Sequence, residues 1–473
     1  MRPRFQRWFV LAAALACACG AGHGHAEIPG RVSGPSPFLQ GCGGDSQPGT
    51  LYMNAEVEPF LAVDPKDSRH LIGVWQQDRW SSGGANGLVS GVSFDGGSTW
   101  TRNAARFSRC SGGDYQRASD PWVSFGPDGT AWQIGLSFDG NGPNRAVLAS
   151  RSGDGGRTWG DPVTLVRDTD PGLALDKESI TADPHDPALV YAVWDRVTEV
   201  TQPNSPTARG PAWFSRTTDG GASWETARMI YDPGPDAQTI SNQIVVLPDG
   251  VLVNLFDVIA GNSTSAPTTR AVVMRSTDKG VTWSPPIPVA QCLFVGSVDP
   301  KNSRPIRTGA VVPAIAADAA SGTLYVAWHD AHFSGGVRDG IALSRSLDGG
   351  LTWSPPMQVN QAPNVQAFTP ALAVARSGRL GVSYYDLRND VASDGSHLLV
   401  TRWLATTADG GATWHETALA PPFDMRTAPF AGGYFLGDYT GLVHDGDSFL
   451  SLFVMTTGDG ANRTGVYLRS ARD

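Results

Sequence analysis

Charged residues are scarce in this sequence, and the basic ones are scarcer than the acidic ones. Asp, Glu, Lys and Arg make up 17% of the 473 residues, and the formal net charge is −9. Nucleic-acid-binding proteins usually carry a basic field, so we expect no nucleic-acid partner. Because 41% of the residues are hydrophobic, the chain has enough material for a large core, which excludes intrinsic disorder.

Long hydrophobic runs are also missing. No stretch reaches the roughly 18 apolar residues that a membrane-spanning helix needs, so we expect no transmembrane segment. A short apolar run at 8–18 follows three arginines and precedes small residues at 24–26, which is typical of a signal peptide. The sequence therefore predicts cleavage after residue 26 and a secreted or periplasmic protein. Residues 14–17 weakly resemble a lipoprotein box, so lipid anchoring is the alternative.

Cysteine is rare, and two of the five cysteines fall in the predicted signal peptide. Cys42, Cys110 and Cys292 remain, which allows one disulfide and one free thiol in an oxidising compartment. We favour the Cys42–Cys110 pair because both residues lie near the first repeat described below. No Cys-x-x-Cys pair is present, so we expect no thiolate zinc site, no other metal and no cofactor.

Glycine and tryptophan are abundant, with 56 and 15 residues, and many of them belong to one repeated octapeptide. The pattern [ST]-x-D-x-G-x-[ST]-W occurs at 93–100, 152–159, 217–224, 276–283, 346–353 and 407–414. The aspartates of successive copies lie 59 to 70 residues apart. Six copies at this spacing are a strong sign of a repeat architecture.

The octapeptide has the chemistry of a hairpin turn. Its Asp can accept hydrogen bonds from nearby backbone N–H groups, its Gly can take a positive φ, and Ser or Thr add local hydrogen bonds. A strand precedes each copy, and two more apolar runs joined by a polar turn lie 20 to 30 residues earlier, as in 315–328. Each unit is therefore predicted to be a four-stranded meander, and radial packing of such units gives an all-β propeller.

The first two strands of the unit recur seven times, although the seventh unit lacks the octapeptide. We therefore predict one domain over residues 27–473 with seven blades, and six blades as the alternative. The last blade has room for only three strands before the C-terminus. We expect the N-terminal segment, around residues 48–56, to supply its fourth strand and so to close the ring.

The functional face should be the one opposite the octapeptide turns. There, loops before each first strand and after each second strand converge on the central channel. Several arginines at these positions, in an acidic protein, predict a site for a carboxylate. The polar candidates are Asp78, Arg79, Arg117, Asp120, Glu178, Arg307, His329, Tyr385, Arg388, Asp438 and Tyr439.

The six octapeptides resemble the Asp boxes of secreted sialidases and related bacterial neuraminidase-repeat proteins, and this resemblance extends over nearly all of the mature chain. The family cleaves terminal sialic acid with retention. It uses three arginines on the sugar carboxylate, a tyrosine nucleophile paired with a glutamate, and an aspartate as acid and base, an exception to the two-carboxylate scheme. The motif is specific for the fold rather than for the activity.

The resemblance implies roles by residue order and by face of the ring. Asp78 or Asp120 would be the acid and base, Glu178 would lie beside the tyrosine, and Tyr439 would be the nucleophile. Arg307 and Arg388 would bind the carboxylate, with Arg79, Arg117, His329, Tyr385 and Asp438 as further substrate-binding residues. The family's Arg-Ile-Pro motif is absent, since 305–307 is its reversal, and sialidases usually have six blades.

Two other functions remain open from the sequence. A uronate-directed lyase or glycosidase on the same fold would use His329, His332 or Tyr385 as a base and Arg307 to neutralise the carboxylate. A non-catalytic carbohydrate-binding propeller would need only the arginine cluster. All three readings predict a monomer with an acidic glycan or glycoconjugate as its partner.

Overall fold

The computed structural model describes residues 28–472, apart from 45, 199–206, 265 and 392–394. The predicted signal peptide lies outside the described residues. Within them the helices are three short 3-10 turns, η1 (Arg109–Ser111), η2 (His332–Ser334) and η3 (Met425–Thr427). The protein is all-β, as the sequence predicts, and no described helix has the length and apolar character needed to cross a membrane.

Antiparallel four-stranded units follow one another along the chain, each with the octapeptide between its third and fourth strands where that motif is present. The first two units are β2 (Leu51–Asp64), β3 (Asp67–Trp80), β4 (Ala85–Ser93) and β5 (Thr101–Asn103), then β6 (Arg117–Phe125), β7 (Ala131–Phe138), β8 (Arg145–Ser152) and β9 (Val163–Asp168). One residue pair, Ala85 with Ala118, joins these two units into a single sheet.

The next units repeat the same order of strands in separate sheets. They comprise β10 (Leu173–Ala182), β11 (Val190–Thr198), β13 (Ala212–Thr217) and β14 (Arg228–Tyr231); β15 (Ala237–Val246), β16 (Leu252–Ala260), β17 (Thr268–Ser276) and β18 (Ile287–Cys292); β21 (Ala314–Ala317), β22 (Leu324–Asp330), β23 (Gly340–Ser346) and β24 (Met357–Gln358); and β25 (Ala367–Val374), β26 (Leu380–Asp386), β27 (Leu399–Thr407) and β28 (His415–Ala418). Short strands β12 (Arg209–Gly210) and β29 (Phe423–Asp424) extend two of these units, through pairing with β15 and β27.

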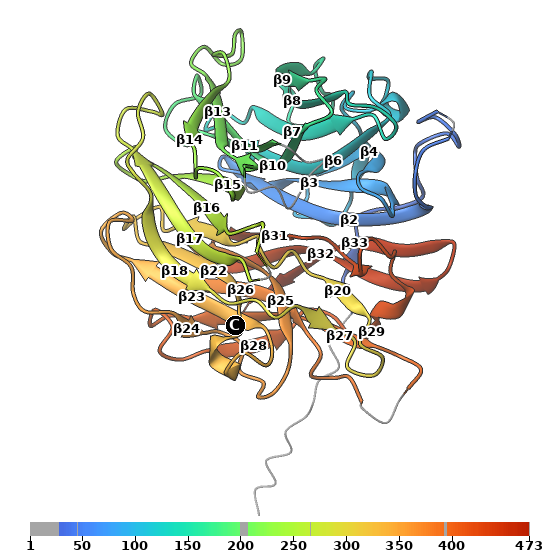
Figure 1. The fold of residues 1–473 in the computed structure, drawn as a ribbon, viewed down its shortest axis with the longest axis vertical. Coiled ribbons are helices and arrows are strands. Elements are labelled where there is room, and N and C mark those ends of the chain that lie inside the picture. Colours follow the sequence, from blue (N-terminus) through green and yellow to red (C-terminus); the bar gives the residue numbers. More distant parts are fainter. Residues whose placement is uncertain (1–27, 45, 199–206, 265, 392–394, 473) are drawn as a thin grey trace, which may run out of the picture.

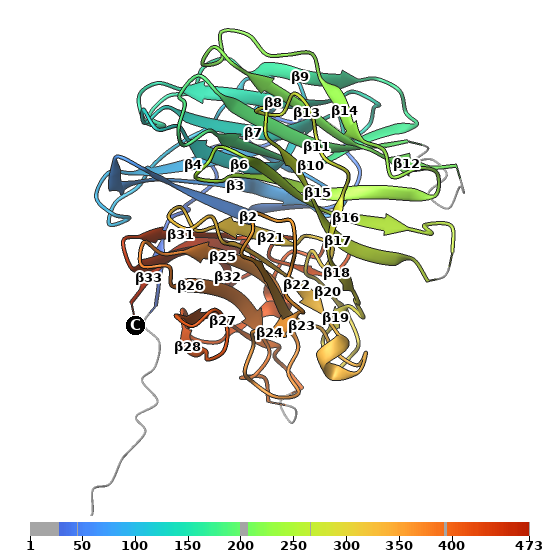
Figure 2. The same ribbon diagram turned by 90° about the vertical axis from the view of Figure 1, so that its left-hand side faces the viewer.

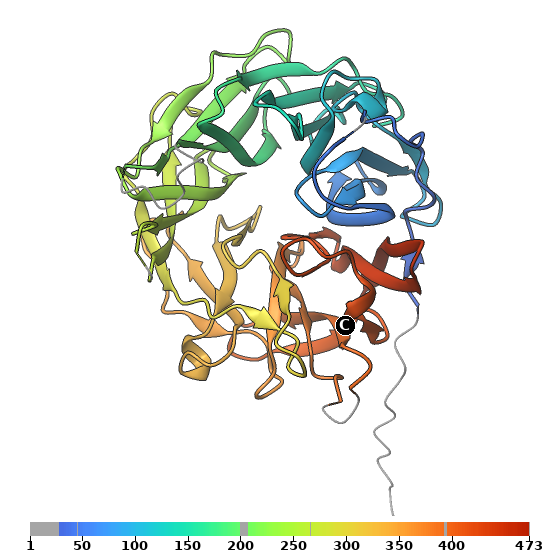
Figure 3. The ribbon, with the colours of Figure 1, turned by 45° about the vertical axis from the view of Figure 1, so that its right-hand side comes forward.

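The units are arranged in a propeller-like ring. In Figure 3 the colour runs around the ring from blue through green and yellow to red, so the first and last units are neighbours. Figures 1 and 2 show the same succession from two other sides. The core lies between successive sheets, since each large hydrophobic cluster combines residues of adjacent units. One cluster, for example, joins Leu255 of β16 and Trp328 of β22 with the octapeptide residue Trp353.

Both ends of the chain meet in one sheet. This sheet contains β31 (Gly441–Asp445), β32 (Ser448–Asp459), β33 (Asn462–Ala471) and, beside β33, the short β1 (Gly30–Arg31). The N-terminal segment thus pairs with the last strand, but at residues 30–31 rather than 48–56. The prediction for 48–56 is wrong because residues 51–64 form β2, the inner strand of the first unit.

A small sheet covers part of one mouth of the ring. It consists of β19 (Ser297–Val298), β20 (Pro305–Arg307) and β30 (Tyr434–Phe435), with β20 and β30 parallel. Residues 293–313, which the repeat does not predict as a blade strand, form most of it. This long connection is fastened to the inner strands, since Ser241 donates a hydrogen bond to the Val311 carbonyl and Thr369 donates one to the Thr308 carbonyl.

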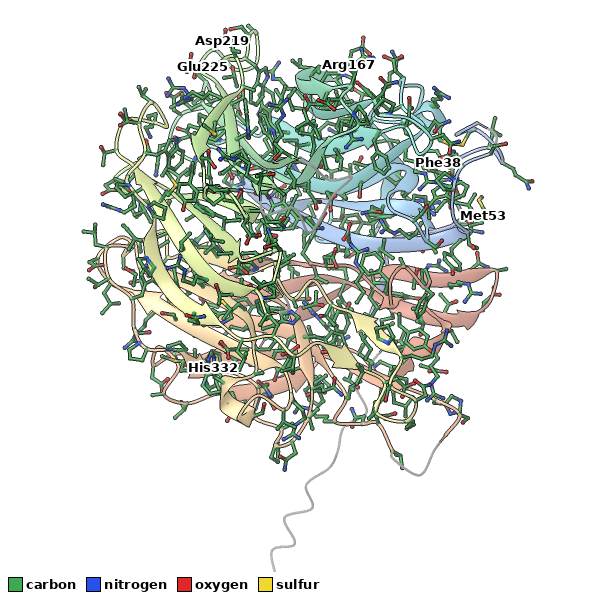
Figure 4. All side chains as sticks on the ribbon, viewed as in Figure 1. Phe38, Met53, Arg167, Asp219, Glu225 and His332 are labelled. Carbon is green, nitrogen blue, oxygen red and sulfur yellow. A yellow bond between two sulfur atoms is a disulfide. The ribbon has the colours of Figure 1, made fainter. Side chains whose placement is uncertain are left out.

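The octapeptides form hydrogen-bonded corners, as their chemistry predicts. At the first corner Asp95 accepts hydrogen bonds from the Thr99 backbone N–H at 2.9 Å and from the Thr99 hydroxyl at 2.6 Å, while Ser93 accepts from the Gly97 N–H. The Asp contacts recur at all the other copies, around Asp154, Asp219, Asp278, Asp348 and Asp409. Asp219 lies at the periphery of the molecule (Figure 4), where a scaffold role is expected.

The inner strands carry a second repeated feature, a β-bulge whose central residue has a positive φ. The register of the strand shifts at each bulge, and the φ values are between 44° and 67°. The residues at these positions are Glu58, Asp120, Lys177, Ser241 and Thr369. Such a conformation is unfavourable for non-glycine residues and is common at functional sites, where a bulge redirects a side chain.

The cysteines behave as predicted. Cys42 and Cys110 form a disulfide with a Cα–Cα distance of 4.9 Å, which links the N-terminal segment to the loop after β5. Cys292, at the end of β18, is a buried free thiol.

Candidate active site

One pocket lies where the inner strands converge, and we call it the central pocket. Its cavity of about 560 Å³ is lined from β2, β3, β6, β7, β10, β15, the connection 306–312 and the segment before β31. This volume falls in the range of ligand-binding sites. Its charged lining residues are Glu58, Arg79, Asp120, Asp176, Lys177, Arg307 and Asp438. Four of these, Arg79, Asp120, Arg307 and Asp438, were expected from the sequence.

Lys177 is the centre of this charged group. Its ammonium nitrogen lies 2.6 Å from Oδ1 of Asp120, 3.3 Å from Oδ2 of Asp438 and 3.4 Å from Oε1 of Glu58. Burial alone would lower the pKa of Lys177, but the nearby carboxylates of Asp120, Glu58 and Asp438 hold it well above its usual value. One cation therefore joins three acids from three different strands or loops.

Arg307 binds Asp438 with two hydrogen bonds, from Nε to Oδ1 at 3.1 Å and from Nη2 to Oδ2 at 2.5 Å. Its guanidinium stacks on the ring of Phe435, and Arg79 stacks on the same ring, with distances to the ring centroid of 4.4 Å and 4.8 Å. Arg79 also donates a 2.6 Å hydrogen bond to Gln76. Both arginines are thus held by protein groups, and Asp438 is neutralised by two cations.

The carboxyl groups of the central pocket divide into two kinds. Burial raises the pKa of Asp176 to about 6, and the charge of Asp120 adds to the effect. Burial also raises the pKa of Glu58 to about 7, although Lys177 opposes the shift. For Asp438 burial is outweighed by Lys177 and Arg307, so its pKa lies well below its usual value. Neighbouring carboxyl groups with separated pKa values can act as acid and base in one reaction.

Asp176 and Asp120 each keep one oxygen without a protein partner among the described residues. Oδ1 of Asp176 accepts a 3.0 Å hydrogen bond from the Lys177 N–H, and Oδ1 of Asp120 accepts the Lys177 ammonium. The second oxygen of each has no hydrogen bond within the part of the chain that the structure describes. These two oxygens are therefore able to meet a ligand in the central pocket.

Glu178 and Tyr439, expected as a catalytic pair, lie buried beside the central pocket and do not line it. The Tyr439 hydroxyl donates a 3.1 Å hydrogen bond to the Pro121 carbonyl, and its ring packs against Trp122. Both carboxyl oxygens of Glu178 are buried without a hydrogen-bond partner among the described residues. Burial raises the pKa values of Glu178 and Tyr439 well above their usual ranges, so neither is poised as a nucleophile here.

Asp78 and Arg117 are placed apart from the central pocket. Asp78 accepts hydrogen bonds from the Asn54 N–H at 2.8 Å and from the Ser36 hydroxyl at 2.6 Å, so it fastens the N-terminal segment to β3. Arg117 stacks on Trp80 at 4.3 Å and lines a second hollow formed by residues of the first three units.

The remaining expected residues also have structural partners. Arg388 stacks on Trp403 and binds Asp386 and Glu416. His329 is fully buried, and its Nε2 accepts a 2.8 Å hydrogen bond from the Thr369 N–H. Burial lowers the pKa of His329 to about 3. The hydroxyl oxygen of Tyr385 accepts a 3.0 Å hydrogen bond from the backbone N–H of Val454 in the next unit.

The sequence placed Glu58 and Lys177 on the functional face but assigned them no role, and it did not indicate Asp176. A signal for Glu58 was present, because Glu58-Pro59-Phe60 and Asp120-Pro121-Trp122 place an acid, a proline and an aromatic residue at the same point of successive units. Phe60 and Trp122 stack with ring centroids 3.5 Å apart, which confirms that the two segments are equivalent neighbours. Asp176 and Lys177 have no such pattern.

The described residues include no group of three or more His, Cys, Asp and Glu side chains arranged to hold a metal ion. His332 bonds Asp330 through Nδ1 at 2.6 Å.

Comparison with known proteins supports the fold reached above. The model of a BNR repeat-like domain matches residues 211–417, a part of the chain that holds four of the six octapeptides. The chain therefore carries BNR repeats on a sialidase-like propeller fold, and the resemblance drawn from the octapeptides is confirmed. No curated protein sequence matches the chain.

Two solved structures are similar over most of the chain. The Hadza microbial sialidase Hz136 has a TM-score of 0.50 and 14% identity, and the match covers 85% of this chain and 73% of that one. The α-L-arabinofuranosidase Arb93A from Fusarium graminearum has a TM-score of 0.51 and 12% identity, with 95% and 98% covered. At these identities the similarity concerns the fold.

Proposed function

We propose that the chain is a glycoside hydrolase whose reaction takes place in the central pocket, with Asp176 as the proton donor. The observation that carries this proposal is the pair Asp176 and Asp120, two carboxyl groups on adjacent inner strands that line one cavity and each offer a free oxygen. Hydrolysis of a glycosidic bond requires one carboxylic acid to protonate the leaving oxygen and one carboxylate as its partner. Asp120 is that partner.

The raised pKa of Asp176 supports its role. With a pKa of about 6, Asp176 is protonated in a large fraction of the protein molecules at mildly acidic pH, whereas an ordinary aspartate is not. The proton of Asp176 passes to the glycosidic oxygen as the bond to the sugar carbon breaks. Water then supplies the hydroxyl group of the released sugar, and the other proton of that water returns to the Asp176–Asp120 carboxyl pair. Lys177 keeps the negative charge of Asp120 and Asp438 balanced during this step.

The reacting sugar is proposed to be uncharged. Two of the three cations that line the central pocket are engaged with carboxylates: Arg307 with Asp438, and Lys177 with three acids. The third, Arg79, is buried, donates a hydrogen bond to Gln76 and stacks on Phe435. A carboxylate entering the central pocket would have to displace these partners. The named activities of the two similar structures, a sialidase and an arabinofuranosidase, support a glycan substrate. The first name refers to a charged sugar and the second to an uncharged one.

The positions of Tyr439 and His329 favour this scheme over the tyrosine-nucleophile and lyase alternatives, since neither residue lines the central pocket. We further propose that the units form seven blades, because each has four strands when β1 is counted with β31–β33. Export through a signal peptide at residues 1–26 is also proposed. The Cys42–Cys110 disulfide supports it, because disulfides persist in oxidising compartments.

The test is a panel of fluorogenic glycosides that includes an α-L-arabinofuranoside, several neutral pyranosides and a sialoside. In parallel, polyuronates are followed by the ultraviolet absorbance of unsaturated products. We expect release from a neutral glycoside, and a loss of at least about a hundredfold in Asp120→Asn. The matched control Asp114→Asn, at an exposed position, should keep full activity. Cleavage of the sialoside alone, or uronate elimination, would replace this proposal with the corresponding alternative.

A further inference from the structure

A second hollow adjoins the central pocket, and we call it the side pocket. It has a cavity of about 330 Å³ and is lined by residues of the first three units, including Ser82, Arg117 and Arg145. Leu136, Phe138 and Leu175 line both hollows. Because the same three side chains form a shared wall, the two hollows are adjacent.

The shared wall has the properties of a sugar-binding platform. Leu136 and Leu175 are buried, while Phe138 is only partly buried and presents its aromatic ring at the boundary of the two hollows. Gly84 allows this placement, since a Cβ there would lie 2.7 Å from the Phe138 ring. Apolar and aromatic surface with a few fixed polar groups is the usual lining of a small-molecule site.

The two hollows differ in how their cations are compensated. In the central pocket Lys177 and Arg307 contact carboxylates, and one lining cation, Arg79, forms no ion pair among the described residues. In the side pocket neither lining arginine forms one. Arg117, in the side pocket, is 1% exposed and forms no ion pair among the described residues. Its hydrogen bonds go to uncharged oxygens, those of Gln47, Pro48, Ser82 and Gly83. A buried guanidinium without a nearby carboxylate is costly, so an anionic ligand would stabilise it.

Arg145 adds a second positive charge to the side pocket. It donates hydrogen bonds to the carbonyl oxygens of Pro143 and Leu173. Its cross-strand neighbour Asp168 is bound by Arg196 through two hydrogen bonds of 2.7 and 2.8 Å. No ion pair of Arg145 is formed within the part of the chain that the structure describes.

The acidic groups that face the side pocket are few. Asp139 lines it, and its carboxylate accepts hydrogen bonds from the Gln116 N–H and from Asn144, at 3.1 Å and 2.9 Å. It also lies 3.9 Å from Arg109. The carboxylate of Asp139 is thus already bound by residues of the surrounding loops. With two arginines and one aspartate, the side pocket carries a net positive charge.

We propose that the side pocket is a second sugar-binding subsite that takes an anionic sugar residue, with its carboxylate or sulfate near Arg117 and Arg145 and its ring on Phe138. This inference rests on the proposed function, because it takes the central pocket as the place of the reacting sugar. The substrate class is then an acidic oligosaccharide in which the residue that is cleaved is neutral and a neighbouring residue carries the charge.

Binding rather than turnover tests this subsite, so its outcome is separate from that of the hydrolase. The Asp120→Asn protein is titrated in a calorimeter with three tetrasaccharides: a neutral galactan, a galacturonate and a sulfated galactan. We expect at least one acidic tetramer to bind about tenfold or more tightly than the neutral one, and the advantage to shrink with added salt. The better of the two acidic tetramers identifies the anionic group.

Variants test whether the binding takes place in the side pocket. Arg145→Gln should remove most of the preference for the acidic tetramer, and Phe138→Ala should weaken the acidic and neutral tetramers alike. The matched control Arg270→Gln, exposed on β17, should change neither. Arg117→Lys keeps the charge and should keep part of the preference. Equal binding of neutral and acidic tetramers, no binding of any tetramer, or an unchanged preference in Arg145→Gln would overturn the proposal. Acidic binding without any hydrolysis would instead contradict the hydrolase alone.

Discussion

The octapeptide corners and the inner-strand bulges repeat in opposite ways. At the corners both the backbone and the side chains recur, and each Asp binds the same two groups of a Ser or Thr four residues later. At the bulges the backbone recurs with a positive φ, but the side chains differ: acids and a lysine on one side of the ring, hydroxyls at Ser241 and Thr369. Side chains that are the same in every unit thus indicate the scaffold, whereas side chains that differ on the same backbone conformation indicate the candidate active site.

The two regions also treat their carboxylates differently. Exposed hydrogen bonds to the Asp lower the pKa values at the corners, to about 2 for Asp95. Burial raises those of inner-strand acids, to about 8 for Glu56 and about 7 for Glu58. The corner groups are therefore stable as anions, whereas the inner groups keep protons available near neutral pH.

The largest effect should come from removing the cation at the third bulge. Lys177→Met leaves Glu58, Asp120 and Asp438 facing one another without their shared partner. We expect the free energy of unfolding to fall by about 3–5 kcal/mol, measured by urea denaturation. Lys66→Met, at an exposed position, is the control. A loss smaller than about 1 kcal/mol would show that Lys177 does not hold the acids together.

A corner variant should separate stability from activity. Trp353→Ala removes a side chain that packs against the cluster between two units, and we expect a loss of about 3 kcal/mol of unfolding free energy. Because the corner lies away from the central pocket, the kcat at a temperature where the variant is folded should be unchanged. If kcat fell tenfold in the fully folded variant, the division between scaffold and site would be contradicted.

The proton donor should show the reverse behaviour. Asp176→Asn should reduce kcat about a hundredfold with little change in melting temperature. In the wild-type protein the donor works in its protonated form, so activity should decline as pH rises through about 6. That decline should be missing from the residual activity of the variant. A pH profile that keeps the same alkaline limb would assign the proton transfer to another group.

The pH dependence of stability should have opposite signs for the two regions. Inner-strand acids bind protons more tightly when folded, so stability should fall as pH rises from about 4.5 toward 8, by up to about 1.4 kcal/mol per pH unit for each group. Corner aspartates have lowered pKa values, so their contribution should be lost as pH falls from about 4 to 2.

Glu56→Gln tests the upper part of this profile. The side chain is buried, and the amide should flatten the slope between pH 5 and 8, measured by thermal unfolding at several pH values. Glu225→Gln, at an exposed position, serves as the control and should leave the slope unchanged. An identical slope in both variants would mean that Glu56 is ionised in the folded protein.

The sequence predicts the scaffold well because the scaffold is local and repeated. The corner hydrogen bonds join residues two to four positions apart, and six copies make the pattern visible. The Cys42–Cys110 disulfide could also be predicted from the sequence, since only three cysteines follow the predicted signal peptide. The donor of the last strand was placed wrongly because β1 has two residues and no apolar alternation, so nothing in its sequence marks it as a strand.

The site was predicted in part because the direction of a side chain near a strand end depends on the bulges. A bulge shifts the two-residue alternation, so neighbours in sequence face different surroundings. Arg79 reaches the central pocket while Asp78, one residue earlier, turns to the N-terminal segment. Arg388 satisfies the same topological rule as Arg79 but is drawn to Glu416 and Trp403 within its own unit. Such partners cannot be seen from residue order.

The pairing of β1 with β33 has a consequence for how this protein is made. Gly30 lies opposite Leu468, so the sheet that unites the two ends cannot form until the ribosome has released the final strand. Contacts between residues so far apart in the sequence are slow to form. Until β33 is made, β1 has no strand to pair with. Loss of either β1 or most of β33 would therefore disrupt the same sheet.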